Sequence, residues 1–167
     1  MSTLTETRRG FTIVRRLDAP RELVFQAWTD PEHLHWFIDT ETAGSRHETT
    51  VDLKTGGAWR LHMIENEERQ YTTGGVYRQV VPPEKLVFTW GAVDGWPPVG
   101  VDSSDDNPVV TVTLKDVDGA TEMTLDVGFD DHVSDEAVRS WLTKGIANGW
   151  TATVDRLGPY LAGLAAR

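Results

Sequence analysis

One stretch near the end of the chain decides the fold: residues 134–164, SDEAVRSWLTKGIANGWTATVDRLGPYLAGL. Its apolar residues recur at steps of three and four, which places them on one face of an amphipathic helix. They are Val138, Trp141, Leu142, Ile146, Trp150, Val154, Leu157, Leu161 and Leu164. Ser134 is suited to cap the first turn, and the two acidic residues after it lie where the helix dipole favours negative charge. The pattern predicts one long helix, which reaches about 36 Å between Ser134 and Leu157 and crosses a small domain.

Two glycines, Gly145 and Gly149, lie one turn apart in this predicted helix. Each costs about 1 kcal/mol relative to alanine in a helix interior. Either an aromatic side chain packs closely against the helix backbone there, or the glycines leave open one wall of a ligand cavity. Further on, Gly158 and Pro159 predict a kink or break, because proline clashes with the carbonyl four residues back. We expect residues 160–164 to form a final turn.

The preceding residues predict an antiparallel sheet, because apolar and polar side chains alternate in most of the segments. The expected strands are 11–17, 50–53, 58–63, 69–81, 86–90, 109–115 and 122–129. Two short helices, within residues 18–29 and 30–38, follow the first strand. Gly74 and Gly75 mark a bend or bulge, Asp118 and Gly119 a hairpin turn, and residues 91–108 a long loop. The order predicts an α+β fold in which a curved antiparallel sheet of about six to seven strands wraps around the C-terminal helix.

Composition limits the class of protein. The 167 residues suit one domain, expected at 11–167 after a flexible N-terminus at 1–10. The net charge of -10 argues against nucleic acid or an anionic membrane surface as a partner. The absence of cysteine excludes disulfides and thiolate metal sites. No apolar run approaches the roughly 20 residues of a membrane span. The first ten residues hold no signal-peptide core, so we expect a cytoplasmic protein.

Several motifs in order resemble the SRPBCC superfamily (START-like, helix-grip fold), and within it the group named for the activator of heat-shock-protein-ninety ATPase homologues. The matching segments cover nearly the whole chain. They are LDAPRELVFQAWTDPE at 17–32, GGAWR at 56–60, Tyr77 with VVPPEKLVFTW at 80–90, TEMTL at 121–125, NGW at 148–150 and DRL at 155–157.

The resemblance implies a helix-grip fold with a cavity between the sheet and the C-terminal helix. Members of the superfamily bind hydrophobic or aromatic small molecules, and some are cyclases or aromatases. The group's name comes from a co-chaperone whose eukaryotic form carries an additional N-terminal domain, for which this chain has no room. Two further departures concern the site. Residues 145–147 lack the histidine that relatives often carry before Gly149 and Trp150, and the loop at 91–108 is extended.

A small-molecule pocket needs an apolar lining with a few polar anchors. The candidates for the lining are Leu34, Trp36, Phe37, Trp59, Leu61, Met63, Phe88, Trp90, Trp141 and Ile146, with Gly145 and Gly149 making room. The competing interpretation is that these side chains fill the core and leave no void. Tyr77 is the candidate polar anchor if its hydroxyl points inward; otherwise it packs at a strand edge with a hydrated hydroxyl.

The sequence favours binding over catalysis. The five histidines, His33, His35, His47, His62 and His132, form no zinc-protease pair, and the acidic run at 102–107 lacks the glycine and glutamate of a calcium loop. No nucleophile elbow, phosphate loop or dinucleotide fingerprint occurs. Arg60, His62, Glu122 and Asp126 alternate away from the apolar faces, which leaves the inner wall short of acid–base groups.

The first hypothesis is therefore a carrier, sequestering protein or sensor that binds a hydrophobic or aromatic small molecule in an internal cavity. We expect no metal, cofactor, nucleic acid or membrane partner, and a monomer or homodimer. One alternative is a polyketide cyclase-like or aromatase-like enzyme. The other is a co-chaperone-like stimulator of a heat-shock ATPase, which needs an exposed apolar patch on the convex face of the sheet that the alternation does not supply.

Overall fold

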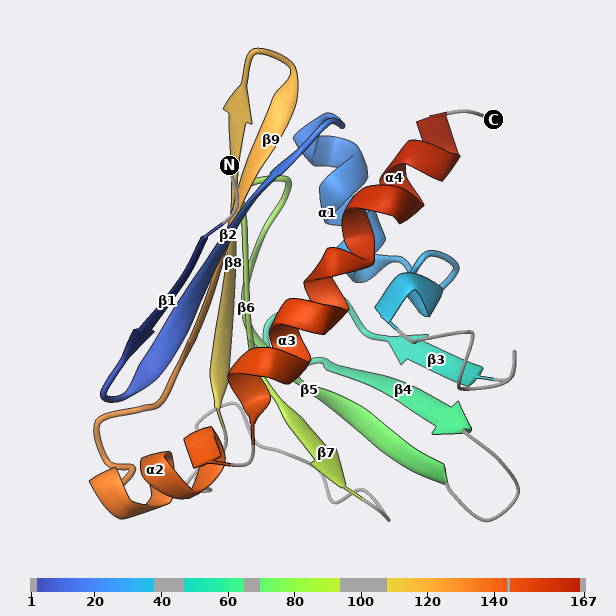
Figure 1. Cartoon of the computed structure of the whole chain (residues 1–167). Coiled ribbons are helices and arrows are strands. Elements are labelled where there is room, and N and C mark those ends of the chain that lie inside the picture. Colours follow the sequence, from blue (N-terminus) through green and yellow to red (C-terminus); the bar gives the residue numbers. More distant parts are fainter. Residues whose placement is uncertain (1–2, 38–46, 65–69, 94–107, 144, 166–167) are drawn as a thin grey trace.

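A computed structural model describes residues 3–37, 47–64, 70–93, 108–143 and 145–165, and shows a curved sheet with helices against its inner face (Figure 1). The strands are β1 (Thr3–Thr7), β2 (Gly10–Leu17), β3 (His47–Val51), β4 (Ala58–Ile64), β5 (Gln70–Val81), β6 (Lys85–Thr89), β7 (Gly91–Val93), β8 (Val109–Val117) and β9 (Ala120–Gly128). All pairings are antiparallel, in the order β1-β2-β9-β8-β6-β5-β4-β3, and β7 also pairs with β5. The predicted helix-grip α+β fold is confirmed.

Two of these nine described strands were not predicted. Residues 3–7 were expected to be flexible but form the edge strand β1, which pairs with β2. The strand β7 occupies the start of the segment predicted as a loop, and the rest of that loop, 94–107, lies outside the described residues. Both are short strands at the margins of the sheet, where alternation over a few residues gives little signal.

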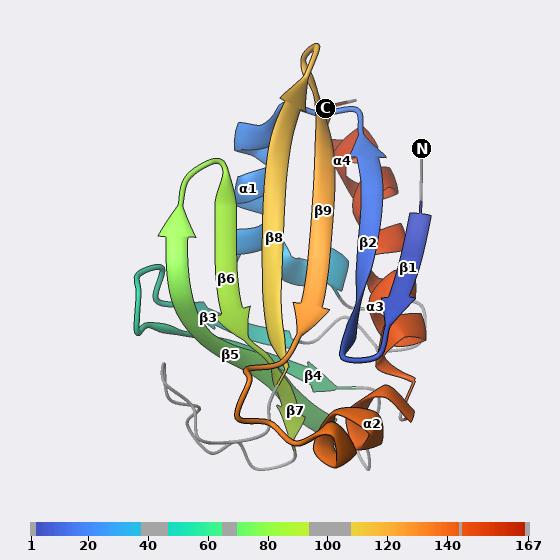
Figure 2. The same ribbon diagram turned by 90° about the vertical axis from the view of Figure 1, so that its left-hand side faces the viewer.

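The predicted strand faces are confirmed in the centre of the sheet. Val110, Val112 and Leu114 of β8 are buried, and so are Met123 and Leu125 of β9, with exposed or half-buried residues between them. The buried face turns toward the helices, while Figure 2 shows the outer face of the same strands with α1, α3 and α4 behind them.

The sheet bends along β5, whose first part pairs with β4 and whose last part pairs with β6. At the bend, a Cβ on Gly75 would lie 1.5 Å from the Thr89 carbonyl oxygen, and one on Gly74 would lie 2.1 Å from the Trp59 carbonyl oxygen. Only glycine allows the neighbouring strands to come this close. The predicted bend at the two glycines is visible in Figures 1 and 2, where β5 curves from β6 toward the flared edge formed by β3 and β4.

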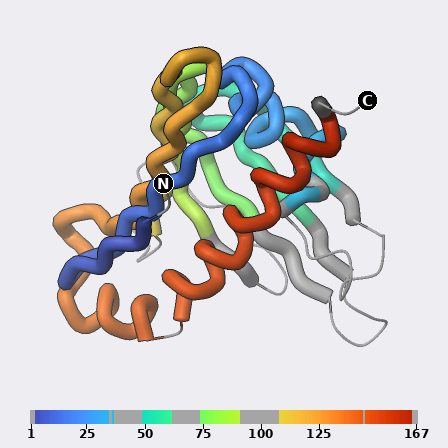
Figure 3. The backbone as a smooth tube through the Cα atoms, turned by 45° about the horizontal axis from the view of Figure 1, so that its top comes forward, coloured from blue at the N-terminus to red at the C-terminus, as the bar shows by residue number. Residues whose placement is uncertain are grey.

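The helical layer differs from the prediction of one long helix. The helices are α1 (Arg21–Thr29), the 3-10 helix η1 (Leu34–Phe37), α2 (Asp135–Thr143), α3 (Ile146–Asp155) and α4 (Leu157–Ala165). Only α3 and α4 form a nearly continuous rod across the inner face, and α2 lies apart from it (Figures 1 and 3). No helix among the described residues is both long enough and apolar enough to cross a bilayer.

Two local conformations divide the predicted helix. Gly145 precedes α3 with a left-handed backbone, φ 84° and ψ 27°, so the chain turns there instead of continuing the helix of α2. The second break comes at Arg156, before the predicted position, and Pro159 falls in the first turn of α4. A proline in the first turn avoids the clash with a carbonyl of the preceding turn. The predicted cap is confirmed, since the Ala137 amide donates to Ser134 Oγ at 3.1 Å.

Polar contacts fix the helices to the sheet. The Arg15 guanidinium of β2 lies 3.1 Å from the Asp155 carboxylate at the end of α3. At the other end of the sheet, Arg8 and Arg9 lie 2.7 and 2.6 Å from the Asp135 carboxylate at the start of α2. Buried apolar side chains of the strands, α1, η1, α3 and α4 meet in one core cluster.

Candidate functional site

The centre of the candidate site is a small apolar cavity between the sheet, α1 and η1. Its volume is about 10 Å³, room for at most one water molecule. It is lined by Trp28 of α1, Leu34 of η1, Trp59 of β4, Tyr77 of β5, and Leu86 and Phe88 of β6. This cavity is far smaller than an aromatic ligand.

Tyr77 is the polar side chain of this lining. Its backbone is held by hydrogen bonds with Gly56 and Gly57, at 2.8 and 2.9 Å, and its side chain is 1% exposed. The interpretation of a hydrated hydroxyl at a strand edge is therefore wrong. Burial, and then the negative charge of Asp52, raise the pKa of the Tyr77 phenol well above its ordinary value of 10. The hydroxyl stays protonated at neutral pH and can donate a hydrogen bond.

Trp28 is a second donor-bearing side chain of the same lining. The residue is 4% exposed, and its indole Nε1 is buried without a hydrogen-bond acceptor among the described residues. The neighbouring Trp36 differs, because its Nε1 donates to the Ala27 carbonyl oxygen at 2.7 Å. A buried N–H without an acceptor costs about 1–3 kcal/mol, so the Trp28 donor requires an explanation.

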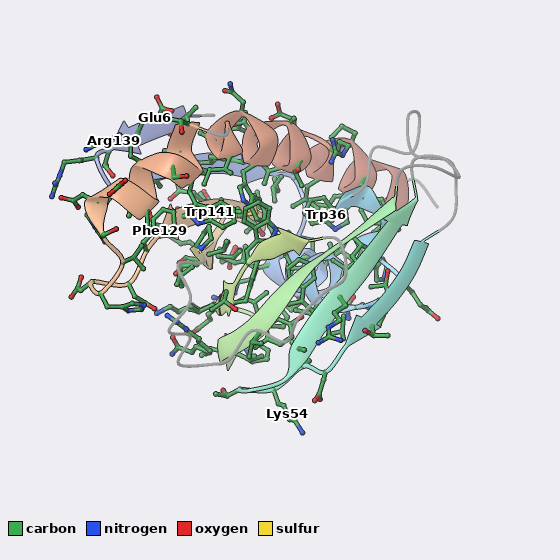
Figure 4. All side chains as sticks on the ribbon, turned by 90° about the horizontal axis from the view of Figure 1, so that it is seen from below. Glu6, Trp36, Lys54, Phe129, Arg139 and Trp141 are labelled. Atoms are coloured by element: carbon green, nitrogen blue, oxygen red, sulfur yellow. The ribbon has the colours of Figure 1, made fainter. Side chains whose placement is uncertain are left out.

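A chain of aromatic rings connects the cavity wall to the junction of α2 and α3. The ring centroid of Trp28 lies 5.0 Å from the ring centroid of Trp36 and 6.5 Å from that of Trp150. Trp150 lies 5.4 Å from Trp90, and Trp90 lies 5.9 Å from Trp141. The first three tryptophans are buried, whereas Trp90 and Trp141 are half-buried. In Figure 4, Trp36 and Trp141 both lie on the inner side of the helices.

The predicted lining residues divide into three groups. Leu34, Trp59, Tyr77 and Phe88 line the cavity; Trp36, Leu61 and Ile146 are buried in the surrounding core; Trp90 and Trp141 are half-buried at its margin. The side chains of Phe37 and Met63 lie outside the described residues. Trp28 and Leu86 were missed. Leu86 lies two residues before Phe88 on the same strand face, and Trp28 lies on the apolar face of α1, so both carried a usable signal.

The glycines Gly145 and Gly149 do not make the close packing contact that was one of the two predictions for them. Both are exposed, and a Cβ on Gly145 or Gly149 would meet no heavy atom within 4 Å. The prediction that an aromatic side chain packs closely against these glycines is therefore wrong. Gly145 lies at a helix junction and not in a helix interior. Their role as an open wall beside a ligand stays a prediction.

The paired acidic and histidine side chains Asp130 and His33 lie away from the cavity lining. Arg78 holds the Asp130 carboxylate through two hydrogen bonds of 2.8 and 2.7 Å, which lower the pKa of that carboxyl. His33 Nδ1 lies 2.6 Å from the Tyr160 hydroxyl. Glu122 and Asp126 are exposed, as predicted. The described residues contain no group of three histidine or acidic side chains placed to hold a metal ion.

Comparisons with known proteins agree on one family. The model of the family described as Activator of Hsp90 ATPase homolog 1-like protein matches residues 18–162. A search of curated proteins gave no match. A solution structure of a protein from Arthrobacter aurescens has a TM-score of 0.79 at 21% identity, covering 96% of this chain and 91% of that chain.

Two further solved structures extend the comparison. A crystal structure of a protein from Rhodobacter sphaeroides has a TM-score of 0.76 at 20% identity, covering 98% of this chain and 99% of that chain. DynU16, a protein of the dynemicin biosynthetic locus, has a TM-score of 0.59 at 21% identity, covering 90% of this chain but 46% of its own. At these identities the likeness concerns the fold alone.

Proposed function

The chain belongs to the family of Activator of Hsp90 ATPase homolog 1-like proteins, and from this premise we propose that it binds a small hydrophobic or aromatic molecule between the curved sheet and the helices. It acts as a carrier, sequestering protein or sensor, in the cytoplasm, as a monomer or homodimer, and without metal or cofactor.

The observation that supports this proposal is the run of aromatic rings from half-buried Trp141 and Trp90 to buried Trp150 and Trp28. Aromatic rings provide large apolar surfaces against which a flat ligand stacks. Each 100 Å² of apolar ligand surface removed from water contributes about 2.5 kcal/mol. Because this cavity is only about 10 Å³, binding within it requires the surrounding rings to rearrange around the ligand.

Native mass spectrometry and tryptophan fluorescence with a panel of one- to three-ring aromatic compounds test the proposal. We expect a one-to-one complex and quenching of fluorescence for at least one compound, and at least a tenfold loss of affinity in Trp90→Ala. The matched control is Leu4→Ala, a truncation of an exposed apolar residue on β1, which leaves the affinity unchanged. Failure of the whole panel to bind would contradict the proposal.

A cyclase-like or aromatase-like enzyme is the second candidate, and the buried Tyr77 phenol is the observation that favours it. A protonated phenol in an apolar wall can donate to a substrate carbonyl and stabilise negative charge that develops there. Turnover of a poly-β-keto substrate, lost in Tyr77→Phe, would support this activity.

The co-chaperone hypothesis finds less support. The large apolar side chains exposed among the described residues are Leu4 on β1 and Leu53 after β3, which belong to opposite edges of the sheet. A docking surface normally needs a contiguous apolar patch of several hundred Å². The direct test is to measure the ATPase rate of a heat-shock chaperone with and without this purified protein.

A further inference from the structure

We infer that the Trp28 indole N–H and the Tyr77 hydroxyl together form a two-donor site that selects ligands carrying a neutral carbonyl oxygen. This inference rests on the proposed binding function and adds the chemical class of the ligand. It starts from two observations: both residues line the same cavity, and the Trp28 Nε1 atom is buried with no acceptor among the described residues.

The two side chains border the same small cavity. The ring centroids of Trp28 and Tyr77 each lie 6.4 Å from that of Phe88, so both rings pack against the same phenylalanine. Trp28 comes from α1 and Tyr77 from β5, which are separate elements that meet at this cavity. A ligand atom in the cavity therefore lies against both donor-bearing side chains.

The composition of the lining determines which polar group fits. Two tryptophans and Tyr77 carry the N–H and O–H donors of the lining, while the side chains of its two leucines and Phe88 carry no polar atom. The Tyr77 oxygen is the acceptor in this lining. A carbonyl oxygen has two lone pairs, accepts two hydrogen bonds and brings no donor of its own. A ligand hydroxyl or amine, by contrast, brings a donor of its own, for which the lining offers the Tyr77 oxygen as its side-chain acceptor, so a carbonyl makes fuller use of the donors.

The charge of the ligand follows from the surroundings. Burial in an apolar wall disfavours an ionised carboxylate or phenolate, and the carboxylate of Asp52 lies near enough to raise the pKa of Tyr77. The chain also carries a net charge of -10. These features favour an uncharged aromatic ketone over an aromatic acid.

A matched pair of probes, 1-indanone and indane, tests the inference, because they differ by a carbonyl in place of a methylene. A carbonyl buried without a hydrogen bond loses its hydration, so an apolar site without donors prefers indane. With the donors in place, we expect 1-indanone to bind the wild-type protein at least as tightly as indane. In Tyr77→Phe we expect 1-indanone to weaken about tenfold and indane to change less than twofold.

The control variant is Tyr160→Phe, which removes a hydroxyl that contacts His33 outside the cavity and leaves both affinities unchanged. The second readout is the indole ¹H–¹⁵N resonance of Trp28, assigned by its loss in Trp28→Phe. We expect a downfield shift with 1-indanone and no such shift with indane. Preference of the wild type for indane by tenfold or more, with the Trp28 resonance unmoved, overturns the donor site but leaves hydrophobic binding in place. If neither probe binds and no other aromatic compound binds, the result counts against the proposed function itself.

Discussion

Gly145 has a backbone conformation that other residues adopt only with strain. Its φ is 84° at the junction between α2 and α3, and a side chain in the left-handed region costs about 1–2 kcal/mol. We expect Gly145→Ala to lower the free energy of unfolding by about 1 kcal/mol, although nothing lies within 4 Å of the added methyl group. Urea denaturation of the purified variant measures the change.

Gly149→Ala is the matched control, one turn further along. Gly149 lies inside α3, is exposed, and also has nothing within 4 Å of a Cβ. Since alanine is favoured over glycine inside a helix by about 1 kcal/mol, this substitution should raise the free energy of unfolding by up to that amount. The same chemical change therefore has opposite signs at the two sites, and equal losses at both would contradict the assigned helix junction.

Tyr77 makes stability depend on alkaline pH. Its pKa is raised in the folded state, so above its ordinary value of 10 the unfolded chain releases the phenol proton while the folded chain keeps it. The contribution is fully present below pH 10 and is lost as the pH rises above it, by up to about 1.4 kcal/mol per pH unit. We expect the free energy of unfolding to fall more steeply between pH 10 and 11 in the wild type than in Tyr77→Phe. Parallel slopes in urea titrations would show that the phenol is not protected.

At the scale of elements, periodic patterns predicted the strands well, because alternation reports directly on which face is buried. The helix junction was not predictable in the same way. The apolar stripe continues in phase through Gly145, and this periodicity outweighed the local sign of a helix end that the glycine itself carries. Asp135 at the start of α2 contacts Arg8 and Arg9, more than 120 residues earlier in the chain. A contact of that sequence separation is invisible to a local pattern.

The ion pair between Arg78 and Asp130 connects β5 to the segment that leads into α2. Two hydrogen bonds stabilise the carboxylate and lower its pKa. The stabilisation is present above the ordinary pKa of 3.8 and is lost as the pH falls through the lowered value. We expect Asp130→Asn to reduce the free energy of unfolding by about 1 kcal/mol at pH 7, a figure kept small because the carboxylate is 35% exposed.

The same substitution should have a smaller effect at pH 3, where the advantage of the wild-type carboxylate is shrinking. Asp131→Asn, which changes the exposed neighbouring residue, controls for the loss of one negative charge and should shift stability by less than about 0.5 kcal/mol at either pH. If both variants behave alike in urea denaturation, the Arg78 contact contributes nothing beyond general charge.

For the whole molecule, the family motifs predicted the architecture, but the candidate site only in part. Four of the proposed lining residues, among them Tyr77 and Phe88, do meet at one cavity. The amount of empty space was not predictable, because it depends on how rings from α1, β4, β6 and α3 interlock, and composition does not determine volume. The unsatisfied donor of Trp28 was also not predictable, since it depends on which acceptors the fold brings near.

The single core shared by sheet and helices determines how ligand binding affects the whole chain. Because side chains of β2, β6, β8, β9, α1, α3 and α4 belong to one cluster, we expect cooperative unfolding that any ligand of the folded state opposes. At a free concentration 100 times its Kd, a ligand stabilises the folded state by about 2.7 kcal/mol. For a chain of this length that raises Tm by roughly 5–10 °C.

Calorimetry with 1-indanone measures this shift. Trp141→Ala removes the outermost ring of the aromatic chain, which is half-buried. At a fixed ligand concentration, we expect this substitution to reduce the ligand-induced rise in Tm by more than it lowers the Tm of the ligand-free protein. Leu53→Ala, at an exposed position between β3 and β4, should leave the shift unchanged. An equal shift in all three proteins would mean that the ligand binds away from the tryptophan chain, because only a ligand that touches those rings senses the loss of Trp141.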